Sequence, residues 1–404
     1  MLRIILVLVL LIQSSDAFLV TQNNFQEQVK VLKSFDIDST FLKDKTFISM
    51  KDKMNRYRTK HFLKVLEEGN RFVPYLRKLI NDSGIPKAFL YLAMAESNFA
   101  PNAYSKAKAV GLWQFMPATA KHFGLKINTY VDERKDPIKS TKAAIKYLKY
   151  LHNIFGKWYL AAIAYNCGEG TLLKAIKRAK SDNLNVLLND RKRYLPRESR
   201  LYIRKIVMME SLANSADFII ENNSDYLLNG GSAETFAKVE VKQGTSLGAV
   251  AASIGLSLKE IRSYNPQLRY DFVPPAKGKY TIYLPYNKQA DFKQNYNPKK
   301  SNNRFFVYRV KKGDSLHKIA RRYGINYHII KDYNHLKSKW LRIKQALIIP
   351  IVKPSMISYT IRKGDTLGKV SHKFNVAINT LIQANNKRNS IIRVGEKLVI
   401  PQMQ

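Results

Sequence analysis

The sequence predicts a multidomain chain in which a mainly α-helical block is followed by small modules of βααβ type. Three observations carry this prediction. The chain has 404 residues, which at roughly 150 residues per domain corresponds to two to four domains. Apolar residues between positions 72 and 216 recur with helical spacing. In the C-terminal half, a pattern of strand, turn and helix recurs three times at similar length.

Residues 1–17 are typical of a secretory signal peptide. Arg3 gives the positive start, Ile4–Ile12 form an apolar run, and small residues precede the end of the segment at Ala17. The apolar run is well short of the roughly 20 residues that a membrane-spanning helix needs. We therefore favour cleavage after Ala17 and export, with an uncleaved membrane anchor as the alternative. Residues 18–71 are polar with scattered apolar side chains, and we expect a helical lead-in.

The block 72–216 is expected to form a single helical domain, because it shows almost no strand pattern. Proline and glycine mark several helix ends, and one alanine-rich segment permits close helix packing. The helices that we predict with definite limits run from Pro86 to about Phe99, from Asp136-Pro137 to about Gly156, and over Trp158–Tyr165.

Each C-terminal repeat consists of an alternating strand, a turn with glycine, two helices and a closing strand that ends in proline. The two later copies share Lys-Gly-Asp followed by a Ser or Thr that is placed to cap a helix. The first copy is weaker, because it lacks the Asp after Gly244. We place the modules at 238–285, 305–350 and 357–401, and we interpret the polar segment 286–304 as a linker.

The chain is strongly basic, with 69 Lys and Arg against 30 Asp and Glu, a net charge of +39. This excess predicts an anionic partner, which could be nucleic acid, an anionic membrane or an acidic polymer such as a cell wall. Export argues against nucleic acid. The single cysteine excludes an intramolecular disulfide, and the seven histidines are scattered, so we expect neither a metal site nor a cofactor.

Glu96 is the first candidate for a catalytic group. It continues the spacing of Ile85, Phe89 and Leu92, which places it on an apolar helix face. A carboxyl group there loses hydration, so its pKa should rise, and a Glu that stays protonated near neutral pH can act as a general acid. From periodicity alone, however, a half-exposed or lysine-paired Glu at a helix end is the favoured interpretation.

An ordered series of motifs reverses that preference. The motifs are Ala95-Glu96-Ser97-Asn98-Phe99, Ala103-Tyr104-Ser105, Gly111-Leu112-Trp113-Gln114-Phe115-Met116-Pro117, Ala164-Tyr165-Asn166-Cys167-Gly168-Glu169-Gly170 and Leu195-Pro196-Arg197-Glu198-Ser199-Arg200-Leu201-Tyr202. The series resembles the family 1 lytic murein transglycosylases, whose domain is lysozyme-like and mainly helical, and segments 131–137 and 141–144 narrow the resemblance to the MltD-like branch. The repeats resemble LysM modules, which bind polysaccharides that contain N-acetylglucosamine.

The resemblance implies roles for particular residues. Glu96 corresponds to the catalytic acid and base. The residues that it places in or beside the saccharide cleft are Ser105, Gln114, Met116, Tyr165, Asn166 and Glu198. Plain structural alternatives remain for some of them, with Tyr165 as a core tyrosine and Glu198 as a residue that serves the fold.

The implied reaction cuts the β-1,4 bond between N-acetylmuramic acid and N-acetylglucosamine in peptidoglycan and leaves 1,6-anhydromuramoyl ends. Ordinary glycosidases use two carboxyl groups, whereas the nearest further acids, Asp132 and Glu133, are expected in a loop. The alternatives are a goose-type lysozyme-like hydrolase, a non-catalytic wall-binding scaffold and, on charge alone, a nucleic-acid-binding protein. The expected partner is the glycan strand in the periplasm, while peripheral contacts with the membrane or wall proteins, and the oligomeric state, are left open.

Overall fold

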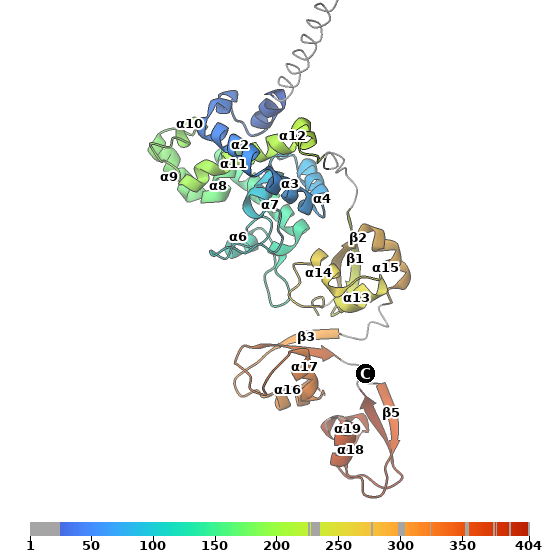
Figure 1. The fold of residues 1–404 in the computed structure, drawn as a ribbon. Helices are drawn as coiled ribbons and strands as arrows, with labels where there is room; N and C mark the ends of the chain where they lie inside the picture. Colours follow the sequence, from blue (N-terminus) through green and yellow to red (C-terminus); the bar gives the residue numbers. More distant parts are fainter. Residues whose placement is uncertain are drawn as a thin grey trace, which may run out of the picture. The chain divides into compact units, whose positions relative to one another are not determined.

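The computed structural model describes residues 25–402 except for 225–226, 228–234, 276–277, 298–303, 324, 352–354, 375, 377 and 388. The predicted signal peptide, 1–17, lies outside the described residues. No helix within the described ranges is long and apolar enough to cross a membrane. The chain divides into two compact units, Met1–Asn128 with Asp132–Phe236, and Thr129–Val131 with Ala237–Gln404 (Figure 1).

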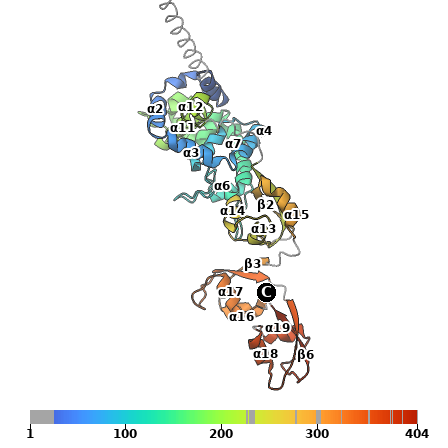
Figure 2. The same ribbon diagram turned by 45° about the vertical axis from the view of Figure 1, so that its right-hand side comes forward.

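The first unit is helical, as predicted. Figures 1 and 2 show α2, α3, α7 and α11 gathered in one bundle. Its helices are 25–34, η1 (Ser39–Lys43), α2 (Lys45–Tyr57), α3 (Thr59–Gly69), α4 (Val73–Ser83), α5 (Phe89–Ser97), α6 (Pro117–His122), η2 (Glu133–Lys135), α7 (Pro137–Phe155), α8 (Trp158–Cys167), α9 (Glu169–Ala179), α10 (Leu184–Leu187), α11 (Arg197–Ala213) and α12 (Ala216–Glu221).

Two of the predicted helix boundaries follow directly from capping residues. The Asp136 side chain accepts hydrogen bonds from the first backbone amides of α7, Pro137 occupies the first turn, and Gly156 ends the helix in the left-handed conformation. The helix predicted to open at Pro86 begins three residues later, at Phe89, because Pro86 lies in the preceding turn. It ends at Ser97, where Asn98 adopts a positive φ of 53°.

The helix α5 belongs to the core, which agrees with the expectation that Glu96 lies on an otherwise buried helix. Phe89 to Met94 are all buried, and so are Tyr159 to Ala164 of α8. The helix α11 packs against both α5 and α8. Glu96 therefore lies in the last turn of a core helix.

Each C-terminal module has two paired strands, two helices and its own apolar core. The strands are antiparallel in the second and third modules. The βααβ prediction is thereby confirmed. The elements are β1 (Phe236–Lys242), α13 (Leu247–Ser253), α14 (Leu258–Tyr264) and β2 (Lys279–Pro285); β3 (Arg304–Arg309), α16 (Leu316–Tyr323), α17 (Tyr327–Tyr333) and β4 (Ala346–Ile351); β5 (Ser355–Thr360), α18 (Leu367–Lys373), α19 (Ile378–Ala384) and β6 (Lys397–Gln402).

One hydrogen-bonded asparagine per module explains the recurring asparagine after the second helix. In the second module, the Asn334 side chain donates to the carbonyls of Ile330 and Ile348 and accepts from the Ile348 amide. Asn265 and Asn385 make the equivalent three hydrogen bonds in their own modules. The side chain thus joins the second helix to the closing strand.

The Asp of the repeated turn also has a structural role. Asp314 accepts hydrogen bonds from the Tyr308 hydroxyl and the Lys311 amide, and Asp365 accepts the equivalent pair in the last module. The first module has Thr245 at this place, and its hydroxyl lies 3.2 Å from the Tyr296 hydroxyl. The missing Asp is therefore replaced by a different local contact.

The linker prediction, 286–304, is wrong over its first part. The segment begins with η4 (Tyr286–Lys288) and α15 (Gln289–Asn295). Phe292 of α15 is buried in the core of the first module, with Tyr296 packed against it. The segment was predicted to be a linker because its composition is polar, but its two aromatic side chains dock the short helix on the module.

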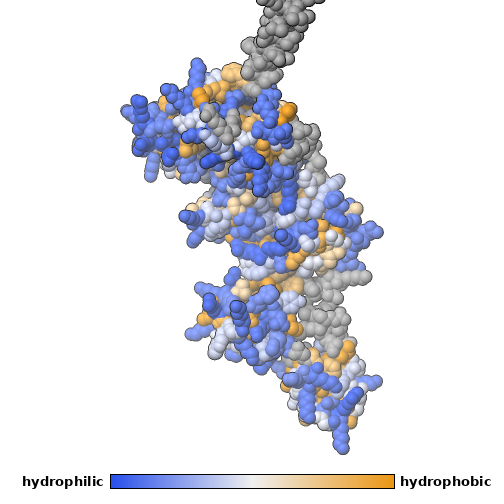
Figure 3. Space-filling view, in the orientation of Figure 1, coloured by the Kyte–Doolittle hydropathy of each residue, from blue (hydrophilic) through white to orange (hydrophobic). Residues whose placement is uncertain are grey.

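Figure 3 shows a face of the molecule that is largely hydrophilic around scattered apolar side chains.

Candidate active site

The Glu96 carboxylate is held by a tyrosine from α11. The Tyr202 hydroxyl donates a hydrogen bond of 2.5 Å to Oε1 of Glu96. Tyr202 is buried, whereas Glu96 is half-buried. Three residues after Tyr202 on α11, Lys205 donates from Nζ to the Ala95 carbonyl at 2.9 Å. A hydroxyl and an ammonium group from α11 therefore lie beside the last turn of α5.

Burial raises the pKa of Glu96 above its usual value, and the negative charge of Glu198 acts in the same direction. The Tyr202 hydrogen bond and the Lys205 charge lower that pKa and oppose the effect of burial. Burial also raises the pKa values of Tyr202 and Tyr165 well above the ordinary range. Both tyrosines are therefore neutral hydrogen-bond donors at physiological pH, whereas Glu96 is subject to opposing influences on its pKa.

The segment after Gly111 is pinned to α5 and α8. The Tyr165 hydroxyl donates to the Trp113 carbonyl at 2.7 Å, and Ser97 donates to the Leu112 carbonyl at 2.8 Å. The negative charge of Glu96 also raises the pKa of Tyr165, so the two groups lie within electrostatic reach. The hydrogen bond to Trp113 is what a core tyrosine would make. The electrostatic effect of Glu96 is what a tyrosine beside the cleft would feel.

Gln114 and Met116 lie on this pinned segment. Gln114 has a positive φ of 46° and donates to the Gly111 carbonyl. Met116 is 44% exposed. Gly111 has a φ of 88°, and a Cβ there would come within 1.9 Å of the Arg134 carbonyl oxygen, so only glycine fits. The segment presents Met116 to solvent from a fixed backbone.

Ser105 takes part in its own turn. Its hydroxyl accepts a hydrogen bond from the Ala109 amide at 3.0 Å, and its amide donates to the Ala109 carbonyl. Its place in or beside the saccharide cleft stays a prediction. Ser105 shapes the loop that precedes the pinned segment.

The first turn of α11 contains Glu198 and the hydrogen-bond partner of Asn166. Ser199 is buried, and its hydroxyl donates to Oδ1 of Asn166 at 2.7 Å. Glu198 is exposed, and its charge acts on Glu96. Asn166 therefore ties α8 to α11, while Glu198 remains accessible beside the candidate acid.

Asp132 and Glu133, the acids that sequence reasoning placed in a loop, are buried in and beside the 3-10 helix η2. Asp132 pairs with Arg134 at 2.8 Å, and Glu133 pairs with Lys139 at 2.6 Å. Arg134 also donates to the Phe115 carbonyl, which links this cluster to the pinned segment. Both acids serve the fold, and neither is available to activate a water molecule.

Sequence reasoning missed the role of Tyr202, although it noted the residue as the end of a motif. The available signal was the spacing from Glu198, because four residues along a helix return to the same face. Lys205 follows on the same side. Among the described residues, no group of three or more His, Cys, Asp or Glu side chains could hold a metal ion.

Comparison with known families agrees with the motifs. Residues 75–187 match the Transglycosylase SLT domain, and residues 235–301 match the LysM-like domain of the lytic transglycosylase MltD. Residues 308–350 and 359–401 each match the LysM domain. The chain is thus a helical SLT transglycosylase domain followed by an MltD-type LysM-like domain and two LysM domains, and the predicted resemblance is confirmed.

Among individual proteins, the chain is homologous to the membrane-bound lytic murein transglycosylase D of Escherichia coli (strain K12). The two are 27% identical over 354 residues, which cover 80% of this chain and 74% of that protein. A putative tributyltin chloride resistance protein of Alteromonas sp. (strain M-1) is 41% identical over 115 residues, covering 28% of this chain and 56% of that protein. The solved 70 kDa soluble lytic transglycosylase of Escherichia coli aligns with a TM-score of 0.30 and 22% identity, over 38% of this chain and 25% of that one.

Proposed function

We propose that this protein is a lytic murein transglycosylase that cuts peptidoglycan strands and is held on them by its LysM modules. The observation that carries the proposal is Glu96, a half-buried carboxyl with a raised pKa, set in an SLT domain and hydrogen-bonded by Tyr202. Burial raises the pKa of Glu96 and so favours its protonated form, which is the form that a general acid requires.

The reaction uses Glu96 twice. Protonated Glu96 first gives its proton to the oxygen that bridges N-acetylmuramic acid and N-acetylglucosamine, and the bond from that oxygen to C1 breaks. The N-acetyl oxygen of the substrate stabilises the anomeric carbon. The Glu96 carboxylate, stabilised by the Tyr202 hydroxyl, then takes the proton of the C6 hydroxyl as its oxygen bonds to C1. A 1,6-anhydro end forms and no water is consumed.

The state of the other acids favours this outcome over hydrolysis. Asp132 and Glu133 are held in buried ion pairs, so neither supplies the second carboxyl of an ordinary glycosidase. Glu198 is the exception, because it is exposed and its charge acts on Glu96. A lysozyme-like hydrolase with Glu198 as base is therefore the second candidate.

The site is tested with Glu96→Gln, which keeps the shape of the side chain but cannot deliver a proton. We expect solubilisation of peptidoglycan to fall by at least about 100-fold, because general acid catalysis typically contributes that much or more. Sedimentation with insoluble peptidoglycan should stay at the wild-type level. Glu67→Gln, a change of the same kind at an exposed residue of α3, serves as the control. Wild-type solubilisation by the Glu96 variant would show that the acid has been misassigned.

We place the protein in the cell envelope and, more specifically, in the periplasm after export. The LysM domains and the MltD-type homologue support the first statement, and the signal-like residues 1–17 support the second. Weak binding modules on one chain raise the local concentration of the catalytic domain at its substrate.

A further inference from the structure

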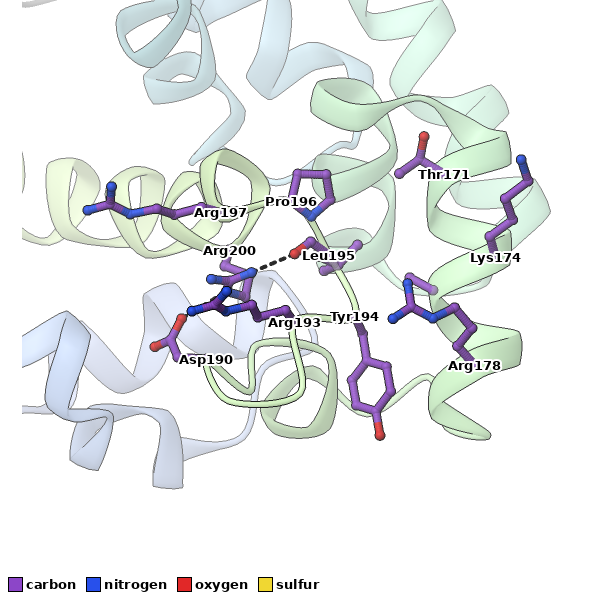
Figure 4. A pocket seen from close by; sticks show the side chains of 11 residues that line it. Thr171, Lys174, Arg178, Asp190, Arg193, Tyr194, Leu195, Pro196, Arg197 and Arg200 are labelled. Carbon is purple, nitrogen blue, oxygen red and sulfur yellow. Dashed lines mark hydrogen bonds and ion pairs between the residues drawn. The ribbon is translucent and has the colours of Figure 1, made fainter.

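A basic pocket lies between α9 and the loop that leads into α11 (Figure 4). Its volume is about 780 Å³. The charged side chains that line it are one acid, Asp190, and five cations: Lys174, Arg178, Arg193, Arg197 and Arg200. The lining therefore carries a net charge of 5 − 1 = +4.

The only acid among these lining residues is already paired. The buried Arg200 donates from Nε to Asp190 at 2.8 Å and from Nη1 to the Leu195 carbonyl at 2.6 Å. Asp190 also accepts from the Thr46 hydroxyl and lies 3.9 Å from Arg204. The Arg200 hydrogen bond lowers the pKa of Asp190, so it stays ionised in this network. The negative charge of Asp190 is therefore taken up by Arg200 and does not cancel the charges of the other four cations that line the pocket.

The cations that remain are presented by ordered backbone. The Asn189 side chain accepts hydrogen bonds from the amides of Arg191 and Lys192, and Arg193 follows with a positive φ of 49°. The Arg178 guanidinium lies 6.0 Å from the centre of the Tyr194 ring. Figure 4 shows Lys174 and Arg178 on α9 and Arg193 on the loop, with Tyr194 between the two sides.

The pocket and the candidate active site share one helical turn. At the start of α11, Glu198 acts on Glu96 and Ser199 binds Asn166. The residues on either side of this pair, Arg197 and Arg200, line the pocket. Arg197 and Arg200 lie on the opposite side of α11 from Glu198 and Tyr202, because successive helix residues are about 100° apart. A group attached to a sugar near Glu96 would therefore reach the pocket by passing the N-terminal end of α11.

We infer that this pocket binds the carboxylates of the peptide stem on the strand being cut, an inference that rests on the proposed function. Guanidinium groups recognise carboxylates through paired hydrogen bonds. The sugars of a stem-bearing strand are uncharged, since the lactyl group of the muramic acid is joined to the stem by an amide bond. The anionic groups that such a strand can offer beside the cleft are thus those of the stem.

The variant Arg178→Gln with Arg193→Gln tests the pocket. Lys33→Gln with Lys60→Gln makes the same change of net charge at exposed positions outside it. Each full-length variant is assayed on stem-bearing strands and on strands from which an amidase has removed the stems. The amidase frees the lactyl carboxylate of each muramic acid, so the comparison tests the stem itself and not the mere presence of an anion on the strand. We expect the pocket variant to lose about 5- to 10-fold in kcat/KM on stem-bearing strands, through a higher KM, and to match wild type on the bare strands.

Two results would overturn the inference: an equal loss on both substrates, or no loss on either. A second measurement does not need catalysis. In the Glu96→Gln background, a soluble stem-bearing glycan fragment should bind about 5- to 10-fold more weakly when Arg178 and Arg193 are also changed. Unchanged binding contradicts the inference. If wild type cuts neither substrate but this binding difference is found, the proposed function fails and the pocket assignment stands.

Discussion

At the scale of single residues, the account depends on how Glu96 changes its charge. Burial favours the protonated acid, and the hydrogen bond from Tyr202 favours the carboxylate. The first step of the reaction needs protonated Glu96 and the second needs its carboxylate, so neither burial nor the Tyr202 hydrogen bond can dominate. Glu96 was found from its motif, whereas its contact with Tyr202 joins residues 106 positions apart and appears only once α5 and α11 are packed.

Tyr202→Phe is predicted to move the pH dependence of activity. The first step needs protonated Glu96, so activity is lost as pH rises through the pKa of that group. Removing the hydroxyl removes a contact that lowers this pKa, so the alkaline limb should shift to higher pH. Activity near neutral pH should fall by roughly 10- to 100-fold, since a hydrogen bond to a charged group typically contributes about 1.5–3 kcal/mol.

The pH–rate profile on soluble glycan fragments measures both effects. Tyr165→Phe is the matched control, because its hydroxyl donates to the Trp113 carbonyl instead of the carboxylate. Its alkaline limb should stay near that of wild type. A limb of Tyr202→Phe that moves to lower pH would contradict the proposed contact.

At the scale of elements, the capping signals of α7 and the three βααβ patterns were predictable from sequence. Two other segments are informative. The helix α5 has apolar residues on every side, so periodicity could not say which face was buried. The helix α15 has a polar sequence, and only the packing of Phe292 and Tyr296 marks it as part of a module. The domain boundaries remain predictions.

The helix α11 carries a buried carboxyl, Glu210, which has a testable cost for stability. Burial raises the pKa of Glu210 from 4.5 to about 8, against the opposing effects of Asn214 and Lys87, and its Oε2 atom has no hydrogen-bond partner. The folded state therefore binds more protons than the unfolded state between these two values. Stability should fall as pH rises from 4.5 to about 8 and then level off.

Glu210→Gln removes this titration. We expect the free energy of unfolding of the helical unit at pH 8 to exceed that of wild type by an amount on the order of 1–3 kcal/mol, and the thermal midpoint to depend less steeply on pH between pH 5 and pH 8. Calorimetry of both proteins across this range, with Glu67→Gln as the exposed control, gives the comparison. A slope identical to that of wild type would place the titrating group elsewhere.

At the scale of the whole molecule, separate cores support separate roles. Each C-terminal module has its own buried cluster, and the candidate catalytic residues lie in the helical unit. The net charge of +39 suits a polymer that carries carboxylates. Composition alone could not choose among anionic partners, and the SLT and LysM matches supplied what charge could not.

Deletion of Asn303–Gln404, which removes both LysM domains, is predicted to lower sedimentation with insoluble peptidoglycan while leaving cleavage of soluble glycan fragments near the wild-type rate. The physical reason is that tethering acts through local concentration, which matters only for the immobile polymer. Equal sedimentation with and without the deletion would refute the binding role. Loss of activity on soluble fragments would show that the parts are not separable.

The most direct test of the central claim is mass spectrometry of a peptidoglycan digest. With Glu96 as the acid and base and the C6 hydroxyl as the nucleophile, every new muramoyl end should be a 1,6-anhydro end. Such an end is lighter by one water than a hydrolysed end and is inert to borohydride, because it has no aldehyde. New ends that contain the extra water and take up hydride would contradict the account and point to hydrolysis, with Glu198 as the first base to replace by Gln.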